Sequence, residues 1–344
     1  MSWLGPDDED EGEWSAWDES DARVRPNPKG NRPRTKIRPE HGDAVEARVL
    51  SVDRGRYTVL VDDDGPTEHV LLAKRARELH NQAIVTGDLV DVVGDTSGDE
   101  GTLGRIVRIQ PRETVLRRSA DDTDAIERII VANADQLLIV VAAANPEPRP
   151  RLVDRYLVAA YDAGITPLMV ITKTDLADPE PFLAGFAELG FPIFRSEPGA
   201  WPIDELAPAL AGHRTVAVGH SGVGKSTLVN ELVPGTDRAV GVVNVVTGRG
   251  RHTSSSTVSL RVPTGGWIID TPGVRSFGLG HVDTSNILRA FSDLAAVAED
   301  CPRGCTHLAD APDCALNEAV ERGELSAARV DSLQRLLSTL GSTP

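Results

Sequence analysis

The pattern of hydrophobic and polar positions changes character near residue 126. Before that point, short segments with alternating or β-branched apolar residues are separated by turns that contain glycine, and each segment predicts a strand. The expected strands are Val45–Val52, Tyr57–Val61, Glu68–Leu72, Asp88–Val93 and Gly104–Ile109. Five short strands of this kind predict a small all-β barrel, and the OB-fold is the first candidate.

After residue 126, continuous apolar runs alternate with segments of helical spacing. This alternation is typical of an α/β fold with a mostly parallel sheet and helices on both faces. The expected strands are Gln136–Ala143, Pro167–Thr172, Pro192–Arg195, Thr215–Val218 and Gly266–Ile269. The expected helices are Leu152–Ala163, Pro181–Leu189, Ile203–Leu210 and Leu228–Leu232, and the last segment, Ala315–Leu340, also has helical spacing.

The chain begins with a segment that has no periodicity. An acidic block between Asp7 and Asp21 is followed by a basic, proline-containing block between Arg23 and Arg38. Such blocks bury too little apolar surface to fold alone, so residues 1–42 are expected to be a disordered tail. The tail is either simply solvated or a basic arm that docks on RNA phosphates.

Charge and composition limit the classes of molecule that the protein is expected to bind. The 344 residues carry a formal net charge of −16, so any contact with nucleic acid must be local. In the barrel, Tyr57 is the sole aromatic residue, which disfavours base stacking, but basic side chains could contact the phosphates of a structured RNA. These are Lys74, Arg75, Arg77, Arg105, Arg108, Arg112, Arg117 and Arg118; the alternative is a plain solvated barrel. With no long apolar run and no signal-peptide pattern, we expect a soluble cytoplasmic protein with no membrane contact.

The strongest motif follows the strand Thr215–Val218. It is a G-x-x-x-x-G-K-S sequence between a strand and a helix, the context that a phosphate-binding loop requires. Its backbone amides would surround the phosphates, Lys225 would reach the β- and γ-phosphates, and the Ser226 hydroxyl would bind Mg²⁺. The expected nucleotide contacts here are Gly219, His220, Ser221, Gly222, Val223, Gly224, Lys225, Ser226 and Thr227.

A second motif follows the strand Pro167–Thr172. Thr172, Lys173, Thr174 and Asp175 match the guanine-recognition pattern N/T-K-x-D at the end of a buried strand. The Asp175 carboxylate can accept from two guanine donors that adenine lacks. After the next strand, Ser196 lies where a backbone contact to the guanine base is expected.

A third motif is D-x-x-G, from Asp270 to Gly273. Asp270 would hold Mg²⁺ through water, and the Gly273 amide would contact the γ-phosphate. The preceding polar segment, Gly248–Thr257, has the composition of a switch loop, in which Thr253 is the expected Mg²⁺ ligand. In this chain the guanine motif precedes the phosphate loop, whereas ordinary GTPases have it after D-x-x-G. The sequence therefore predicts a circularly permuted GTPase domain.

All three cysteines lie close together near the C-terminus. Cys301, Cys305 and Cys314, with His307, form a Cys₃His set within 14 residues. This clustering favours a structural Zn²⁺ site over disulfides or unligated thiols.

Together these motifs resemble the bacterial ribosome small-subunit-dependent GTPases, over about residues 44–340. The resemblance implies an OB-fold RNA-binding domain at 43–113, a circularly permuted GTPase domain at 114–282, and a zinc-binding helical domain at 283–344. It implies GTP and GDP as ligands, Mg²⁺ and one Zn²⁺ as cofactors, and the 30S subunit and 16S rRNA as partners of a monomer that acts late in 30S maturation.

The resemblance also bears on catalysis. Val274 stands where Ras-like enzymes have a water-orienting Gln, so the family suggests His252 of the switch loop as the catalytic group, together with Lys225. This arrangement implies slow intrinsic hydrolysis that the 30S subunit accelerates. The alternatives are a GTP-switched RNA-binding assembly factor whose hydrolysis is incidental, and an ATP-using enzyme, which Asp175 disfavours. Three positions differ from the usual family pattern: Thr172 replaces Asn, the switch loop has HTSSS in place of HTTT, and the cysteine spacing is x₃ and x₆.

Overall fold

The computed structural model describes residues 41–80, 82–119, 127–196, 199–234, 257–271 and 277–341. The described residues belong to one compact unit that begins at His41. The tail expected over residues 1–42 lies outside this part of the chain, apart from its last two residues.

The N-terminal strands close into a five-stranded barrel. They are β1 (Val45–Asp53), β2 (Arg56–Val61), β3 (His69–Arg75), β4 (Leu89–Gly94) and β5 (Gly104–Ile109), with a short 3₁₀ turn at Arg77–Leu79. The strand order β1-β2-β3-β5-β4 is closed by pairing of β4 with β1. Alternate residues of each strand fill the interior, and Val59, Val90 and Ile106 are fully buried there. The predicted OB-like barrel is confirmed.

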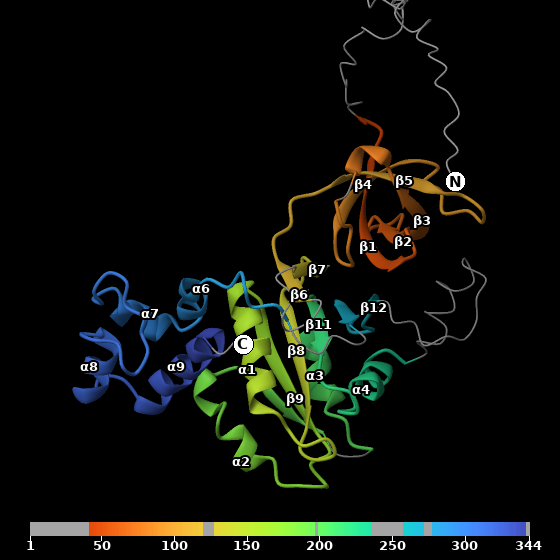
Figure 1. Cartoon of the computed structure of the whole chain (residues 1–344). Coiled ribbons are helices and arrows are strands. Elements are labelled where there is room, and N and C mark those ends of the chain that lie inside the picture. Colours follow the sequence, from red (N-terminus) through yellow and green to blue (C-terminus); the bar gives the residue numbers. More distant parts are fainter. Residues whose placement is uncertain are drawn as a thin grey trace, which may run out of the picture. The chain divides into compact units, whose positions relative to one another are not determined.

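The second half contains a largely parallel sheet (Figure 1). Its strands are β8 (Gln136–Ala142), β9 (Thr166–Thr172), β10 (Ile193–Arg195), β11 (Arg214–Val218), β12 (Val258–Arg261) and β13 (Trp267–Asp270), in the order β10-β9-β8-β11-β13-β12. Only β12 among them is antiparallel to its neighbour. Along β8, Ile139 belongs to one apolar cluster and Val140 to another. The sheet is therefore buried on both faces, as a continuous apolar run predicts.

Helices cover the two faces of this sheet. They are α1 (Pro150–Asp162), α2 (Glu180–Leu183), α3 (Ile203–Leu210) and α4 (Lys225–Leu232). Tyr156 and Leu157 of α1 pack into the cluster that contains Ile139, while Leu206 of α3 and Leu228 of α4 pack into the other. Because the parallel strands point the same way, their carboxyl ends meet at one edge, which carries the predicted motifs.

The C-terminal part is helical. It contains α6 (Thr284–Arg289), α7 (Ser292–Ala298), α8 (Ala315–Glu321) and α9 (Ala327–Gly341). Helix α9 packs on α1, where the Arg335 Nε donates to Asp154 at 3.1 Å and the guanidinium lies over the Phe186 ring. The C-terminal helices thus continue the core on one face of the sheet.

Several elements differ from the prediction. The segment expected as one helix at Pro181–Leu189 is the single turn α2 followed by a 3₁₀ turn at Ala187–Leu189. The expected segment Ala315–Leu340 is two helices, because Gly323 between them adopts a left-handed conformation with φ 72°. The hairpin of β6 (Val115–Ser119) and β7 (Glu127–Ala132) was not predicted, and neither was β12. Through β12, which pairs with β1, the barrel and the parallel sheet form one 11-stranded sheet.

Candidate nucleotide and metal sites

The phosphate-binding motif forms a tight loop between β11 and α4. Strand β11 ends at Val218 and helix α4 begins at Lys225, so the first turn of the helix carries Ser226 and Thr227. Gly219 passes so close to β8 that a Cβ at this position would lie 2.5 Å from the Val140 carbonyl oxygen. Gly224 immediately before the helix has φ 96°, a conformation that glycine alone adopts without strain. The loop therefore requires its glycines for backbone shape, as a phosphate cradle does.

The lysine of this loop faces the end of β13. Lys225 Nζ donates to the Asp270 carboxylate, and the two side chains are only 12% and 24% exposed. The next residue, Thr271, is buried and donates its hydroxyl to the Ala217 carbonyl at 2.8 Å. These contacts join the phosphate loop to the D-x-x-G motif, although the two are 45 residues apart.

The guanine motif is attached to the same loop. The buried Thr172 hydroxyl donates to the Val223 carbonyl at 2.6 Å, and Lys173 Nζ donates to the Gly222 carbonyl at 2.8 Å. Asp175 is exposed at the rim of the site. The structure thus brings the predicted base-recognition motif directly onto the predicted phosphate loop.

Neighbouring residues complete this edge. Ser196, which follows β10, is buried and its amide donates to the Ile171 carbonyl at 2.8 Å. The Thr174 hydroxyl lies 3.5 Å from the Ser196 carbonyl, so the two loops expected at the base are adjacent. Lys173 Nζ also donates to the carbonyl of Asn145, a residue that the sequence motifs did not indicate. Only the folded chain brings Asn145 here, since it follows β8 at the adjacent strand end.

Part of the predicted site lies outside the described residues. These positions are His252 and Thr253 of the expected switch loop and Gly273 of D-x-x-G. Their assigned roles remain predictions.

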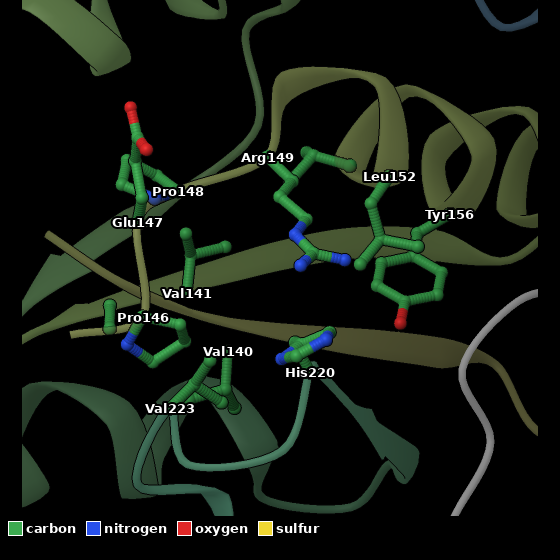
Figure 2. Close-up of a pocket in the computed structure, with 12 residues that line it drawn as sticks. Val140, Val141, Pro146, Glu147, Pro148, Arg149, Leu152, Tyr156, His220 and Val223 are labelled. Atoms are coloured by element: carbon green, nitrogen blue, oxygen red, sulfur yellow. The ribbon is translucent and has the colours of Figure 1, made fainter. Parts of the chain in front are cut away.

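A pocket opens beside the phosphate loop (Figure 2). Its apolar wall comes from Val140 and Val141 of β8 and from Leu152 and Tyr156 of α1. His220 of the loop and Arg149 before α1 add polar groups to its lining. The sequence did not indicate this pocket, because its walls come from segments that are apart in the chain.

The four metal-ligand candidates also come together. The Sγ of Cys301 lies 3.5 Å from the His307 Nδ1 and 4.0 Å from the Cys314 Sγ, and all four ligand atoms lie within 4.8 Å of one another. Ligands at about 2.3 Å from Zn²⁺ in a tetrahedron are about 3.8 Å apart, so this set has the correct size. Burial raises the pKa of the Cys301 thiol to about 11, with the neighbouring Cys314 and Cys305 adding to it, and burial lowers the pKa of His307. The residues present therefore fit a metal ion.

Basic residues of the barrel align across three strands. The register pairs Arg56 of β2 with Lys74 of β3, and Lys74 with Arg105 of β5. All three side chains are exposed, and none forms an ion pair with a residue in the described part of the chain. Like charges directly opposite each other are unfavourable in a sheet. This cationic row (Arg56, Lys74 and Arg105) is therefore suited to an anionic partner.

The fold and the arrangement of these motifs define a circularly permuted P-loop GTPase. The family model described as RsgA GTPase matches residues 109–280. A protein of Pseudomonas aeruginosa strain LESB58, named small ribosomal subunit biogenesis GTPase RsgA, is 40% identical over 269 residues, which is 76% of this chain and 77% of the relative. The chain belongs to the RsgA GTPase family.

Further comparisons agree with this assignment. The protein of the same name from Haemophilus influenzae strain 86-028NP is 36% identical over 310 residues, 88% of this chain and 87% of the relative. Among solved structures, YjeQ from Thermotoga maritima matches with a TM-score of 0.64 at 27% identity, over 87% of this chain and 99% of that one. YloQ, described as a circularly permuted GTPase, matches with a TM-score of 0.62 at 24% identity, over 89% of this chain and 98% of that one, and supports the fold. No helix among the described residues is long and apolar enough to cross a membrane.

Proposed function

We propose that this protein hydrolyses GTP to GDP and phosphate, and that it does so in the biogenesis of the small ribosomal subunit. One observation carries the proposal: Thr172 and Lys173 of the guanine motif donate hydrogen bonds to the phosphate loop itself, at Val223 and Gly222. A base held by Asp175 and phosphates held by the loop would therefore belong to one ligand. The names of the curated relatives supply the ribosomal context.

We assign the nucleotide contacts from the position of each motif. Asp175 recognises the guanine N1–H and N2–H₂, with the loops of Thr172–Asp175 and Ser196 around the base. The amides of Gly219–Thr227 and the ammonium of Lys225 hold the phosphates. The hydroxyls of Ser226 and Thr253 and the carboxylate of Asp270 provide oxygen ligands of the kind Mg²⁺ prefers, and the Gly273 amide contacts the γ-phosphate.

The hydrolysis step needs a group that orients water. Val274 has no polar atom for this purpose, so we assign the role to His252, while Lys225 holds the γ-phosphate. Lys225 exchanges its present partner, Asp270, for the phosphates when the nucleotide binds. The metal, once bound, neutralises the charge that develops on the phosphate oxygens.

The partner that fits the barrel is RNA. The overall charge of −16 repels nucleic acid, but the cationic row concentrates three positive side chains on one face. Contacts of this kind reach phosphates without reading bases, which is how proteins recognise much structured RNA. We therefore propose the 30S subunit, through its 16S rRNA, as the partner of the barrel of this monomeric, cytoplasmic protein.

The C-terminal cluster is proposed to hold one Zn²⁺. Three thiolates and one imidazole are the ligand set of many closed structural zinc sites. Cys314 is buried directly before α8, and Cys301 follows α7, so the ion would tie these two helices together. Its role is structural, because four protein ligands leave no open position for a substrate.

The nucleotide assignment is tested by competition. GTP should displace a fluorescent GDP analogue from the wild-type protein, whereas ATP at equal concentration should not. Lys225→Ala should remove triphosphate binding or turnover while the melting temperature stays close to that of the wild type. Displacement by ATP as effective as by GTP, or full turnover in Lys225→Ala, would refute the assignment.

A further inference from the structure

Strand β13 is four residues long and has a different partner at each end. At its carboxyl end, Asp270 accepts from Lys225 of the phosphate loop. At its amino end, Trp267 is only 8% exposed and packs with Leu50 and Leu60 of the barrel. One short strand therefore contacts both the nucleotide site and the barrel.

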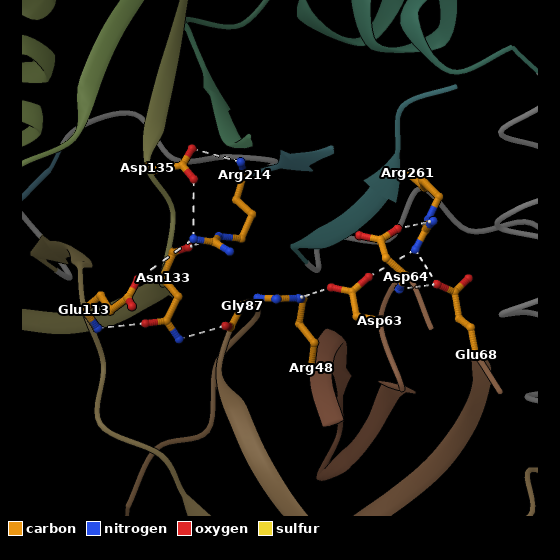
Figure 3. Close-up of polar contacts among 10 residues, drawn as sticks. All are labelled: Arg48, Asp63, Asp64, Glu68, Gly87, Glu113, Asn133, Asp135, Arg214 and Arg261. Carbon is orange, nitrogen blue, oxygen red and sulfur yellow. Dashed lines mark hydrogen bonds and ion pairs between the residues drawn. The ribbon is translucent and has the colours of Figure 1, made fainter. Parts of the chain in front are cut away.

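The neighbouring strand, β12, adds a cluster of charges to the same contact (Figure 3). The Arg261 guanidinium donates to Asp63, Asp64 and Glu68 in the turn between β2 and β3, with distances of 3.0 Å to Asp63 and 2.9 Å to Asp64. The same guanidinium lies 4.9 Å from the centre of the Trp267 ring. Although the three carboxylates are close enough to hold a cation, the guanidinium already occupies the position between them. We call Arg261 and these three carboxylates the Arg261 cluster.

The backbone pairing between the barrel and β12 is short. Among the described residues, β1 pairs with β12 at Ser51 and Val258, and Val258 is in turn paired with Asp270. Ser51 of the barrel is thus two strands away from the carboxylate that faces Lys225. A displacement of β13 would therefore be felt at this residue pair, at the Trp267 packing, at the Thr86 hydroxyl that donates to the Thr257 carbonyl at 3.3 Å, and at the Arg261 cluster.

A second attachment of the barrel is much firmer (Figure 3). The side-chain amide of the buried Asn133 donates to the Gly87 carbonyl at 3.0 Å. The backbone carbonyl of Asn133 accepts from the Arg214 Nε at 2.7 Å. Gly87 has φ 91°, and a Cβ there would lie 2.0 Å from the Ala132 carbonyl oxygen. The attachment at Gly87 is therefore buried, whereas the arginine of the Arg261 cluster is 39% exposed, and solvent-exposed ion pairs contribute little to stability.

We propose that the β12–β13 hairpin couples nucleotide binding to the barrel, and that the Arg261 cluster is the contact that yields. The inference rests on the proposed function, in which Lys225 leaves Asp270 to bind phosphates. When Lys225 turns to the phosphates, Asp270 loses this partner while β13 stays paired with β11. The resulting shift at the carboxyl end of β13 is then taken up where the hairpin meets the barrel, at the Arg261 cluster. By linkage, an RNA that binds the loosened barrel favours GTP by the same factor.

Hydrogen exchange measured on the full chain tests this coupling without a ribosome. A nonhydrolysable GTP analogue with Mg²⁺ should speed amide exchange around Ser51 and in the turn at residues 62–68 by at least about fivefold, the lower range of allosteric couplings. Arg261→Ala should exchange rapidly at these sites without nucleotide and respond less than about twofold to it, since the contact is already open. Its affinity for the analogue should not fall, because Arg261 lies outside the nucleotide site.

The matched control is Arg322→Ala, which removes an exposed arginine paired with Glu324 and Glu318 in the C-terminal helical part and should respond as the wild type does. If Arg261→Ala does not fold, the double variant Asp64→Asn with Glu68→Gln removes two partners of the same guanidinium and should give the same result. Unchanged or slower exchange at the turn in wild-type protein that has bound the analogue would overturn the coupling. A full response in the folded variants would overturn the role of Arg261. Failure of the wild type to bind the analogue would instead refute the proposed function.

Discussion

Thr172 connects the guanine motif to the phosphate loop. The motif pattern allows Asn or Thr at this position, and here a buried hydroxyl donates to the Val223 carbonyl at 2.6 Å, with the Val141 carbonyl 3.3 Å away. The short side chain reaches this carbonyl because the end of β9 lies directly beside the phosphate loop. The residue therefore joins the two loops that are proposed to hold the base and the phosphates.

Removal of this hydroxyl should weaken nucleotide binding. Thr172→Val leaves the Val223 carbonyl without its donor, which costs about 1–3 kcal/mol, or roughly 5- to 150-fold in GDP affinity if the loop must be held in this shape to bind. Thr215→Val is the control, because Thr215 of β11 is also buried. Its hydroxyl donates to the side chain of Gln136, the first residue of β8, at 2.9 Å. The control should lower the melting temperature yet leave GDP affinity unchanged. Equal GDP affinity in Thr172→Val and wild type would contradict this account.

Base selectivity should depend on Asp175. The exposed carboxylate has two acceptors for two guanine donors, and each such charged hydrogen bond contributes about 1.5–3 kcal/mol. Asp175→Asn should therefore lower GTP affinity and raise affinity for xanthosine triphosphate, whose C2 carbonyl can accept from the new amide. Binding of both nucleotides by isothermal titration checks this exchange. A variant that keeps the preference for GTP would place base recognition elsewhere.

At the scale of elements, the local hydrophobic pattern was sufficient to predict the strands wherever that pattern is periodic. The barrel strands and the strands β8, β9 and β11 were predicted within a few residues, because β-branched and apolar runs bounded by glycine turns leave few alternatives. Strand β12 was missed, since four residues directly after a polar segment carry almost no period. The Ser51–Val258 pairing could not be predicted either, because it joins segments that are far apart in the chain. For the site, the motifs indicated the residues of the phosphate loop and the guanine motif, and only the fold revealed that Asn145 lies against the same edge as Lys173.

The metal cluster gives a prediction for the C-terminal helices. Protein purified without added metal should contain about one zinc per chain, and Cys301→Ser should lose it and increase protease sensitivity of α7 and α8. Since burial raises the pKa of the Cys301 thiol to about 11, metal binding must displace a proton. Zinc should therefore be released more easily as the pH falls. Three freely titrating thiols in the native protein would contradict the assignment.

The cationic row makes a prediction for the barrel. Lys74→Glu combined with Arg105→Glu should weaken binding to 30S subunits and reduce the slope of log affinity against log salt by about two, one for each phosphate that is no longer neutralised. Basal GTP turnover should not change, because both residues are remote from the phosphate loop in the sheet order. Arg322→Glu, at the end of α8, is the control for a change of charge alone. An unaltered salt dependence would show that RNA binds another face.

At the scale of the whole molecule, the described residues join a barrel, a parallel sheet and a group of C-terminal helices in one continuous structure. The nucleotide edge lies on the parallel sheet, the barrel extends that sheet through β12, and the C-terminal helices pack against α1 on one face. A partner that contacts the barrel can thus influence the nucleotide site, provided that it binds one arrangement more tightly than the other. An increase of about 100-fold in turnover requires about 2.7 kcal/mol of such preference, a modest amount for a large RNA interface.

The most direct test of the central claim is GTP turnover titrated with purified 30S subunits. We predict slow turnover by the free protein and an increase of about 100-fold at saturating 30S, corresponding to the preference of about 2.7 kcal/mol. His252→Ala should keep GTP affinity and lose the stimulated rate, because binding and water orientation use different residues. A wild-type protein whose turnover does not respond to 30S subunits would contradict the account.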